Sequence, residues 1–266
     1  LSEAARPMLI LGQGALARPD GAAVLALAAR IASATGMIGP EGAPSEGGWN
    51  GFNVLNSAAS RVGALDLGFV PGEGGRDVDG ILEGASKGEI SFVYLLGADE
   101  IDMDRLGDAF TVYQGSHGDA GAHRADVVLP GAAYTEKSGL YVNIEGRVQL
   151  AKRATFPPGN AKEDWAILRA LSEILGKTLP YDDLDALRAS IVAEAPHFGE
   201  RDVLPVRPGA DPNIWRAIGT PGPIDTAQPL RATITDYYLT NPLARASETM
   251  AECSRLFVHR EQMAAE

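Results

Sequence analysis

Short apolar runs recur along the chain, and each ends in a glycine, a proline or a polar turn. They occupy residues 8–11, 92–96, 109–114 and 125–130, and their length and abrupt ends are typical of buried strands. The run at 92–96 is a good candidate for a central strand. Stretches with helical spacing lie between or after the runs, so strands and helices alternate. This pattern predicts an α/β fold with a mainly parallel sheet and flanking helices.

Helical periodicity is clearest after residue 160. We expect Asn160 to cap this helix, Glu163 to complete a capping box and Gly176 to end it. The apolar stripe of this helix comprises Trp165, Leu168, Leu171 and Leu175. A second helix, at 181–195, repeats the pattern.

Two further helices are predicted nearer the start of the chain. The first has Pro19 in its first turn and ends at Gly36. Its apolar stripe comprises Val24, Leu27 and Ile31. A shorter helix is predicted at 78–88.

The last predicted helix begins with Asn241 as its cap and Pro242 in its first position. Its apolar face comprises Leu243, Ala246, Met250, Cys253 and Phe257, and its charged residues Arg245, Glu248, Glu252 and Arg255 lie largely off that face. Such a helix either packs on its own domain or covers a neighbouring protein chain. The pattern leaves both options open.

A long glycine-rich segment separates the first helix from the second strand. Residues 36–75 hold eleven glycines, and we expect a folded excursion that buries Trp49, Phe52 and Phe69. Proline and glycine are frequent again after residue 205. We therefore expect an α/β domain at 1–205, followed at 206–266 by a linker and a C-terminal extension that carries the last helix.

Composition narrows the function classes. The formal net charge of −12 over 266 residues argues against nucleic acid or an anionic membrane surface as a partner. The single cysteine, Cys253, excludes an internal disulfide and a Cys-rich metal or iron–sulfur site built from this chain alone. The most apolar stretch is interrupted by Arg30 and is too short to span a bilayer. Because the chain begins with Leu1 and has no signal peptide pattern, we expect a fragment of a longer polypeptide.

Ligands of open α/β sheets collect beyond the carboxyl ends of the strands. Four turns therefore qualify as candidate sites: residues 12–15, 97–100, 115–119 and 130–137. The first contains Gly12, Gln13 and Gly14 and imitates a dinucleotide fingerprint. Pro19 is expected to delay the helix, and no clear strand ending in an acid follows. We therefore interpret this turn as a plain glycine turn.

The next two turns contain carboxylates and histidines. His117 and Asp119, with His123 nearby, have the residue types of a metal site or of a general base with its orienting partner. A glycine loop whose short polar side chains bond to the backbone is the simpler interpretation. Asp99 and Glu100 lie in an acidic stretch that lacks calcium-loop spacing, and a solvated helix start explains them better.

The fourth turn is the most polar. Glu136 and Lys137 have the types of an acid/base pair and Ser138 that of a nucleophile, but no nucleophile-elbow sequence surrounds this serine. We interpret Glu136, together with Asn143 and Arg147 further along, as residues that fix a turn and the segment after it.

Two motifs of this region resemble those of a known family. The run "ADVVLPGAAYTEKSGLYVNIEGRVQ", followed by "FPPGNAKEDWAILRALSEILG", is similar to the signature of the molybdopterin oxidoreductase superfamily. Within that superfamily, "VYLLGADEID" and the tail "ITDYYLTNPLARASETMAECS" resemble the large iron–sulfur subunit of NADH:quinone oxidoreductase, respiratory complex I. The similarity runs from about Met8 to Leu256. It implies a Rossmann-like, molybdopterin-oxidoreductase-like sheet with a C-terminal helical extension.

The same resemblance implies a role without catalysis. The family's iron–sulfur clusters lie in an N-terminal part, so this fragment is expected to hold no cofactor, no metal and no catalytic residue. The implied partners are that N-terminal part and other peripheral-arm subunits, on the cytoplasmic side of a bacterial inner membrane and without insertion into it. The alternative is a pterin- or nucleotide-binding fragment of a formate-dehydrogenase-like enzyme.

One departure from the molybdenum enzymes supports loss of the cofactor. Those enzymes commonly end the strand equivalent to "YLLGADE" in a polar residue and a proline, whereas here Asp99 and Glu100 follow. Two carboxylates repel a pyrophosphate unless a cation or an arginine neutralises them. The residues expected to line the vestigial crevice are Gly12, Gln13, Gly14, Asp99, Glu100, His117, Asp119, Glu136, Asn143 and Arg147.

Overall fold

The computed structural model describes residues 3–37, 49–205 and 217–259. Contacts within the chain divide it into two compact units. Unit 1 comprises Leu1–Leu67, Leu140–Leu150 and Ala195–Thr235, and unit 2 comprises Gly68–Gly139, Ala151–Glu194 and Asp236–Glu266. The predicted boundary at residue 205 adjoins a stretch outside the described residues and stays a prediction.

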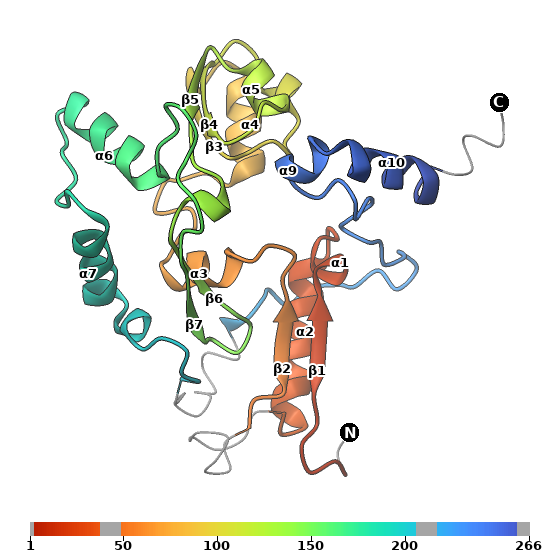
Figure 1. Ribbon diagram of the computed structural model, residues 1–266. Helices are drawn as coiled ribbons and strands as arrows, with labels where there is room; N and C mark the ends of the chain where they lie inside the picture. The colour runs from red at the N-terminus through yellow and green to blue at the C-terminus, as the bar shows by residue number, and fades with distance from the viewer. Residues whose placement is uncertain (1–2, 38–48, 206–216, 260–266) are drawn as a thin grey trace. The chain divides into compact units, whose positions relative to one another are not determined.

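Unit 1 is built on a short parallel strand pair with a helix packed along it (Figure 1). Leu9 pairs with Phe52, and the register continues to Gly12 opposite Leu55. The elements of unit 1 are β1 (Leu9–Gly12), α1 (Gln13–Leu16), α2 (Gly21–Ala34), β2 (Phe52–Leu55), α3 (Arg61–Asp66), the hairpin strands β6 (Gly139–Val142) and β7 (Val148–Ala151), and η4 (Pro196–Gly199).

Unit 2 is built on a three-stranded parallel sheet in the order β3-β4-β5. Helices α4 and α5 lie on one side of this sheet in Figure 1. Its elements are α4 (Val78–Ser86), β3 (Phe92–Leu96), η2 (Met103–Leu106), β4 (Phe110–Gly115), α5 (Ala120–Arg124), β5 (Val127–Pro130), η3 (Tyr134–Glu136), α6 (Asp164–Ile174), α7 (Leu184–Glu194), α9 (Pro242–Arg245) and α10 (Glu248–Phe257).

The core of unit 2 joins α4 to the sheet. Alternate residues of β3 and β4 point to the same face because side chains along a strand alternate. The core cluster consists of Leu82, Ala85, Val93, Leu95, Leu106, Ala109 and Tyr113.

All four strand runs are confirmed as strands within one or two residues, and the sheets of β1–β2 and β3–β5 are parallel as predicted. The central strand is β4, however, and not the run at 92–96, which forms an edge.

The glycine-rich segment contains more structure than the pattern predicted. It includes β2 and α3, which the periodicity did not indicate because β2 is only four residues long. Phe52 and Trp49 are partly buried, and the Trp49 Nε1 donates to the Pro7 carbonyl at 3.0 Å. The expectation that Phe69 is buried was wrong, because its side chain is 83% exposed.

The first helix also differs from the prediction. One turn of helix, α1, begins at Gln13 directly after the glycine, so Pro19 does not delay the helix but separates α1 from α2. Small residues make up the buried face of α2, whereas Leu27 of the predicted stripe is 43% exposed. The buried alanines are Ala23, Ala26, Ala28, Ala29 and Ala32. Gly36 has φ +66°, the left-handed conformation that ends the helix as predicted.

Helix α6 begins three residues later than predicted. Lys162 forms a parallel bridge with Gly131, in which the Ala132 N–H donates to the Lys162 carbonyl at 2.8 Å. This pairing holds the chain extended after Asn160, so Glu163 and not Asn160 takes the cap position. Gly176 ends the helix in the left-handed conformation, as predicted. Helix α7 is confirmed.

The last helix is two helices. Asn241 caps α9 by accepting from the Ala244 N–H at 2.9 Å, as predicted. Ser247 then adopts an extended conformation and caps a second helix, α10, by accepting from the Met250 N–H. On the predicted apolar face Cys253 is half-buried, and Phe257 is 67% exposed.

Candidate functional site at the strand ends

The parallel register of unit 2 brings two of the predicted turns together. Strands β3 and β4 end at the same edge, and the Gly97 N–H donates to the Gln114 carbonyl at 2.8 Å. The acidic turn after β3 therefore lies beside the turn that leads from β4 into α5. The sequence-predicted residues Asp99, Glu100 and Asp119 converge there.

Asp99 is a buried acceptor. Its side chain accepts from the Tyr113 hydroxyl at 2.7 Å and from the Gly121 N–H at 2.9 Å, and Asp99 is only 8% exposed. Burial and the neighbouring Asp99 raise the pKa of the Tyr113 hydroxyl above its ordinary value. A Cβ on Gly121 would lie 2.7 Å from the Tyr113 ring, and one on Gly115 would lie 2.3 Å from its hydroxyl. The glycines of this loop therefore make room for an internal tyrosine.

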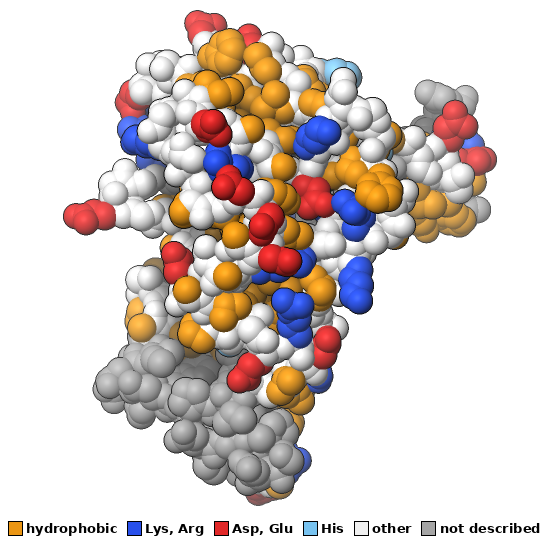
Figure 2. All heavy atoms as spheres, turned by 60° about the vertical axis from the view of Figure 1, so that its left-hand side comes forward, with side chains coloured by type: hydrophobic (Ala, Val, Ile, Leu, Met, Phe, Trp, Pro, Cys, Tyr) orange, Lys and Arg blue, Asp and Glu red, His pale blue; other side chains and the backbone are white. Residues whose placement is uncertain are grey.

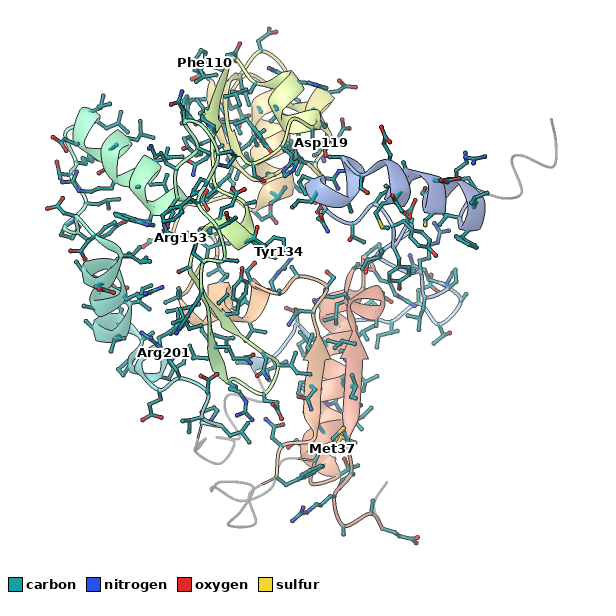
Figure 3. The ribbon with its side chains drawn as sticks, in the orientation of Figure 1. Met37, Phe110, Asp119, Tyr134, Arg153 and Arg201 are labelled. Carbon is teal, nitrogen blue, oxygen red and sulfur yellow. The ribbon has the colours of Figure 1, made fainter. Side chains whose placement is uncertain are left out.

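Arg245 supplies the cation that the carboxylates require. From α9 its guanidinium donates to the Asp119 carboxylate, which lies at the start of α5 (Figure 3). Its Nη1 also lies 3.6 Å from Glu100 Oε1 and donates to the Leu239 carbonyl at 3.3 Å. Sequence reasoning noted Arg245 only as a residue off the apolar face. The available signal was an arginine four residues after a helix cap, which does not reveal a partner so far away in the sequence.

The pKa values in this cluster favour the charged pair. Burial opposes ionisation of Asp119, but the hydrogen bonds from Arg245 and from the Ala120 N–H outweigh it and lower the pKa of Asp119. Burial likewise opposes charge on Arg245, yet its hydrogen bond to Asp119 raises the pKa of the guanidinium. Asp119 and Arg245 therefore form an internal ion pair in which the charged forms of both groups are favoured.

His117 takes no part in this cluster through its ring. Its Nδ1 lies 3.0 Å from the Ser116 hydroxyl, and His123 is exposed. Among residues 3–37, 49–205 and 217–259, no three or more histidine, cysteine, aspartate or glutamate side chains are placed to hold a metal ion.

In unit 1 the glycine turn has a protein partner. The Gln13 Nε2 donates to Asn56 Oδ1 at 2.8 Å, so the residue after β2 is an amide and not the acid of a dinucleotide site. A Cβ on Gly14 would lie 2.5 Å from the Arg231 carbonyl oxygen, whereas one on Gly12 would meet nothing within 4 Å.

The polar turn after β5 forms an internal network. Glu136 accepts from the Ala133 N–H at 2.9 Å, and Lys137 forms an ion pair with Asp164 of α6. The fully buried Gln114 donates to the same aspartate at 2.8 Å. Ser138 accepts from the Arg153 N–H at 3.1 Å. These contacts fix the turn to the sheet and to α6.

Asn143 and Arg147 lie in the hairpin of unit 1. The Asn143 Oδ1 accepts from the N–H groups of Glu145 and Arg147, each at 3.0 Å, which closes the turn between β6 and β7. The Arg147 side chain donates to the Asp202 carbonyl at 2.9 Å. Both residues bond to backbone groups, as expected of residues that fix a turn and its neighbour.

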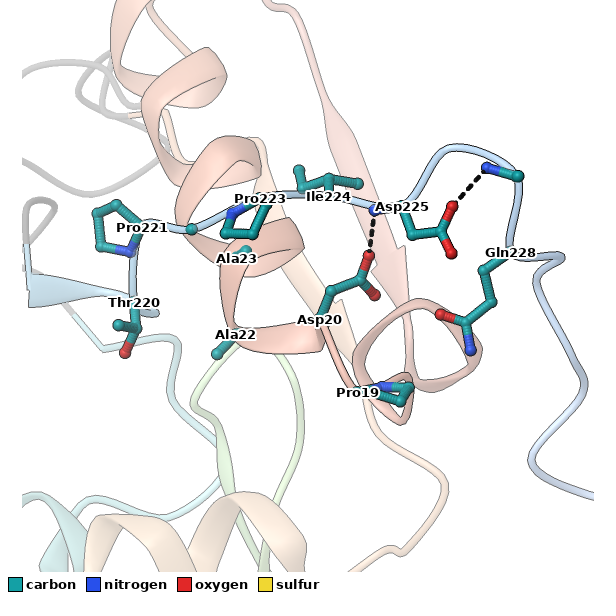
Figure 4. A pocket seen from close by; sticks show the side chains of 12 residues that line it. Pro19, Asp20, Ala22, Ala23, Thr220, Pro221, Pro223, Ile224, Asp225 and Gln228 are labelled. Atoms are coloured by element: carbon teal, nitrogen blue, oxygen red, sulfur yellow. Dashed lines mark hydrogen bonds between the residues drawn. The ribbon is translucent and has the colours of Figure 1, made fainter.

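The surface carries charged side chains of both signs, and unit 1 has an open depression. On the face shown in Figure 2, lysine and arginine side chains lie among aspartate and glutamate side chains. An open depression of about 900 Å³ lies in unit 1 beside the start of α2 and residues 220–228 (Figure 4). Its lining is largely apolar, with Ala23, Pro223 and Ile224 among its residues. Over the described residues, the helices are too short or too polar to cross a bilayer.

Comparisons with known proteins agree with the motifs. The family model for molybdopterin oxidoreductase matches residues 1–174, and a second model, for the C-terminal part of the G subunit of NADH-ubiquinone oxidoreductase, matches residues 216–253. The NADH-ubiquinone oxidoreductase 75 kDa subunit of Reclinomonas americana is 42% identical over 97% of this chain and 35% of its own length. The 78 kDa mitochondrial subunit of Candida albicans is 44% identical over 97% of the chain and 34% of its own length.

The chain thus spans about a third of the length of these curated relatives. The first family model covers more than half of the chain, and the parallel strands and flanking helices of both units fit it. The chain belongs to the molybdopterin oxidoreductase family.

Proposed function

We propose that this chain is a structural, non-catalytic part of the large iron–sulfur subunit of respiratory complex I, in which the ancestral cofactor crevice is closed. The second family model, at residues 216–253, and the relatives named as NADH-ubiquinone oxidoreductase subunits support this assignment. In the parent complex, electrons pass from NADH to quinone through groups held outside this chain. The proposed partners are the rest of the same subunit and its peripheral-arm neighbours.

The family name raises the question of a molybdopterin cofactor. Its pyrophosphate is anionic, so a strand-end site for it requires uncompensated positive charge or free N–H donors. Here Asp99, Glu100 and Asp119 gather at that edge around one cation, Arg245, whose Nε donates to Asp119 and whose Nη2 is buried without a hydrogen-bond partner. Three carboxylates against one guanidinium leave the edge with a net negative charge, which repels a pyrophosphate. The residues do not fit an anionic cofactor at this edge.

The Asp119–Arg245 ion pair is the observation that carries the proposal. Arg245 lies within the segment matched by the second family model, and its contact with the turn after β4 fills the edge with protein. A domain of this kind contributes by packing and by holding its neighbours.

Co-purification tests the assignment. The full-length polypeptide that contains this chain would be tagged in its source cells and isolated from solubilised membranes. We expect NADH:ubiquinone oxidoreductase activity to elute with the tag at a constant ratio to protein, with an untagged strain as the control. Elution alone, or with formate-oxidising activity, would contradict the proposal and favour a formate-dehydrogenase-like enzyme.

A further inference from the structure

Residues 219–231 of unit 1, here called the strap, cross the start of α2 and reach the glycine turn after β1. At its beginning the Thr220 N–H donates to the Ala22 carbonyl at 3.1 Å. Gly219 has φ +72°, and a Cβ there would lie 2.5 Å from both the Ala22 carbonyl oxygen and the Ala26 nitrogen. This end of the strap therefore lies directly on the backbone of α2.

Charged groups attach the middle of the strap. Arg18 donates to the Gln228 carbonyl at 2.7 Å and to the Asp225 carbonyl at 2.6 Å. The same guanidinium forms a two-pronged ion pair with Asp20, whose carboxylate accepts from the Asp225 N–H at 2.9 Å. Figure 4 shows this last bond, with Ile224 and Pro223 beside α2. The side chains of Arg18 and Asp20 are only 10% and 13% exposed, so water competes little for these bonds.

The far end of the strap meets the glycine turn. The Arg231 carbonyl oxygen approaches Gly14 so closely that a Cβ would lie 2.5 Å from it, whereas Gly12 has open space and φ −82°. In a dinucleotide fingerprint the first glycine permits the tight turn and the second the approach of the pyrophosphate. Here Gly12 has a conformation open to any residue, and the group that comes closest to Gly14 is a carbonyl of the same chain.

We propose that the strap is an internal ligand of the glycine turn and permanently closes unit 1 to a dinucleotide. Its anchors at the start, middle and end hold it as a fixed part of the fold. This inference goes beyond the role in complex I, because it concerns unit 1 and rests on contacts that do not involve Asp119 or Arg245.

A matched pair of glycine variants tests the strap. Gly14→Ala and Gly12→Ala would be made in the full chain and compared by hydrogen exchange followed by mass spectrometry. We expect Gly14→Ala to lower amide protection in residues 12–24 and 219–231 by about tenfold or more, because the strap must move away. Gly12→Ala should match the unsubstituted chain. Equal effects of the two variants, or unchanged protection in Gly14→Ala, would overturn the proposal.

An anchor variant and a ligand titration complete the test. Arg18→Gln removes both bonds to strap carbonyls, and Arg61→Gln changes an exposed arginine of the same unit as a control. We expect loss of strap protection in Arg18→Gln alone and no saturable binding of ADP-ribose by the unsubstituted chain. Protection that survives Arg18→Gln, or saturable binding of ADP-ribose by the unsubstituted chain, contradicts the strap as internal ligand. Neither result bears on co-purification with NADH oxidation, so the two proposals fail separately.

Discussion

The carboxylate of Asp119 and the guanidinium of Arg245 lie 126 positions apart in the sequence and form an ion pair in unit 2. Both side chains are about three-quarters buried. An ion pair of this kind stabilises less than its geometry suggests, but loss of one member is costly because the other charge remains without compensation. A single residue of the tail thereby reduces the negative charge that the carboxylates place at the strand-end edge.

Arg245→Gln should therefore destabilise unit 2. We expect the free energy of unfolding to fall by about 1–3 kcal/mol, because a charge-assisted bond is lost and Asp119 stays partly buried. Urea denaturation of the full chain is the measurement. Arg105→Gln, which breaks an exposed pair with Asp79, is the control and should change stability by less than about 0.5 kcal/mol. Equal effects of the two variants would show that Arg245 is an ordinary surface residue.

A second residue-scale prediction concerns acid. Hydrogen bonds from Arg18 lower the pKa of Asp20 to about 2, below its ordinary 3.8. The unfolded chain therefore binds the proton more readily, and the contribution of Asp20 to stability is present above pH 4 and lost as the pH falls towards 2. In urea unfolding across this range, Asp20→Asn should reduce the dependence of stability on pH. An identical pH dependence in this variant would be contrary to the prediction.

At the scale of elements, two asparagines show that local sequence sets the start of one helix and that a distant backbone pairing sets the start of another. Both precede predicted helices, yet Asn241 caps α9 while Asn160 lies outside α6. The bridge between Gly131 and Lys162 competes with the helix for the backbone and delays it. Local patterns therefore predicted the existence and type of α6, and a long-range pairing set its first residue.

Alanine substitutions at these two asparagines provide a matched comparison. Asn241→Ala should lower the protection of the Ala244 amide and cost about 1 kcal/mol of stability, as loss of a helix cap does. Asn160→Ala should cost less than about 0.5 kcal/mol. Amide exchange measured by NMR, together with urea denaturation, distinguishes the two. If Asn160→Ala proves the more harmful substitution, the helix start at Asp164 is wrong.

Most strands and helices could be predicted because their apolar periodicity and their glycine and proline ends are local signals. The carboxylates of the candidate site were found in the same way, since Asp99, Glu100 and Asp119 lie within four residues of a strand end. Arg245 and the strap could not be found, because their contacts depend on how distant segments fold back. Strand β2 was missed because four residues carry too little periodicity.

At the scale of the whole molecule, each of the two units is assembled from separate stretches of sequence, and the C-terminal third contributes to both. Residues 195–235 belong to unit 1 and residues 236–266 to unit 2. Within unit 1 the strap contacts the first strand turn, and within unit 2 Arg245 contacts the turn after β4. The segment matched by the second family model thus supplies protein groups at both sets of strand ends.

The measurement that tests this account most directly is the molybdenum and pterin content of the full-length protein, purified within its native assembly. Elemental analysis and extraction of oxidised pterin would be referred to the amount of this chain. The closed crevice predicts molybdenum and pterin far below one equivalent per chain, with NADH oxidation intact in the same preparation. One equivalent of each would contradict the account, because a bound cofactor would have to displace the Asp119–Arg245 pair from the strand ends.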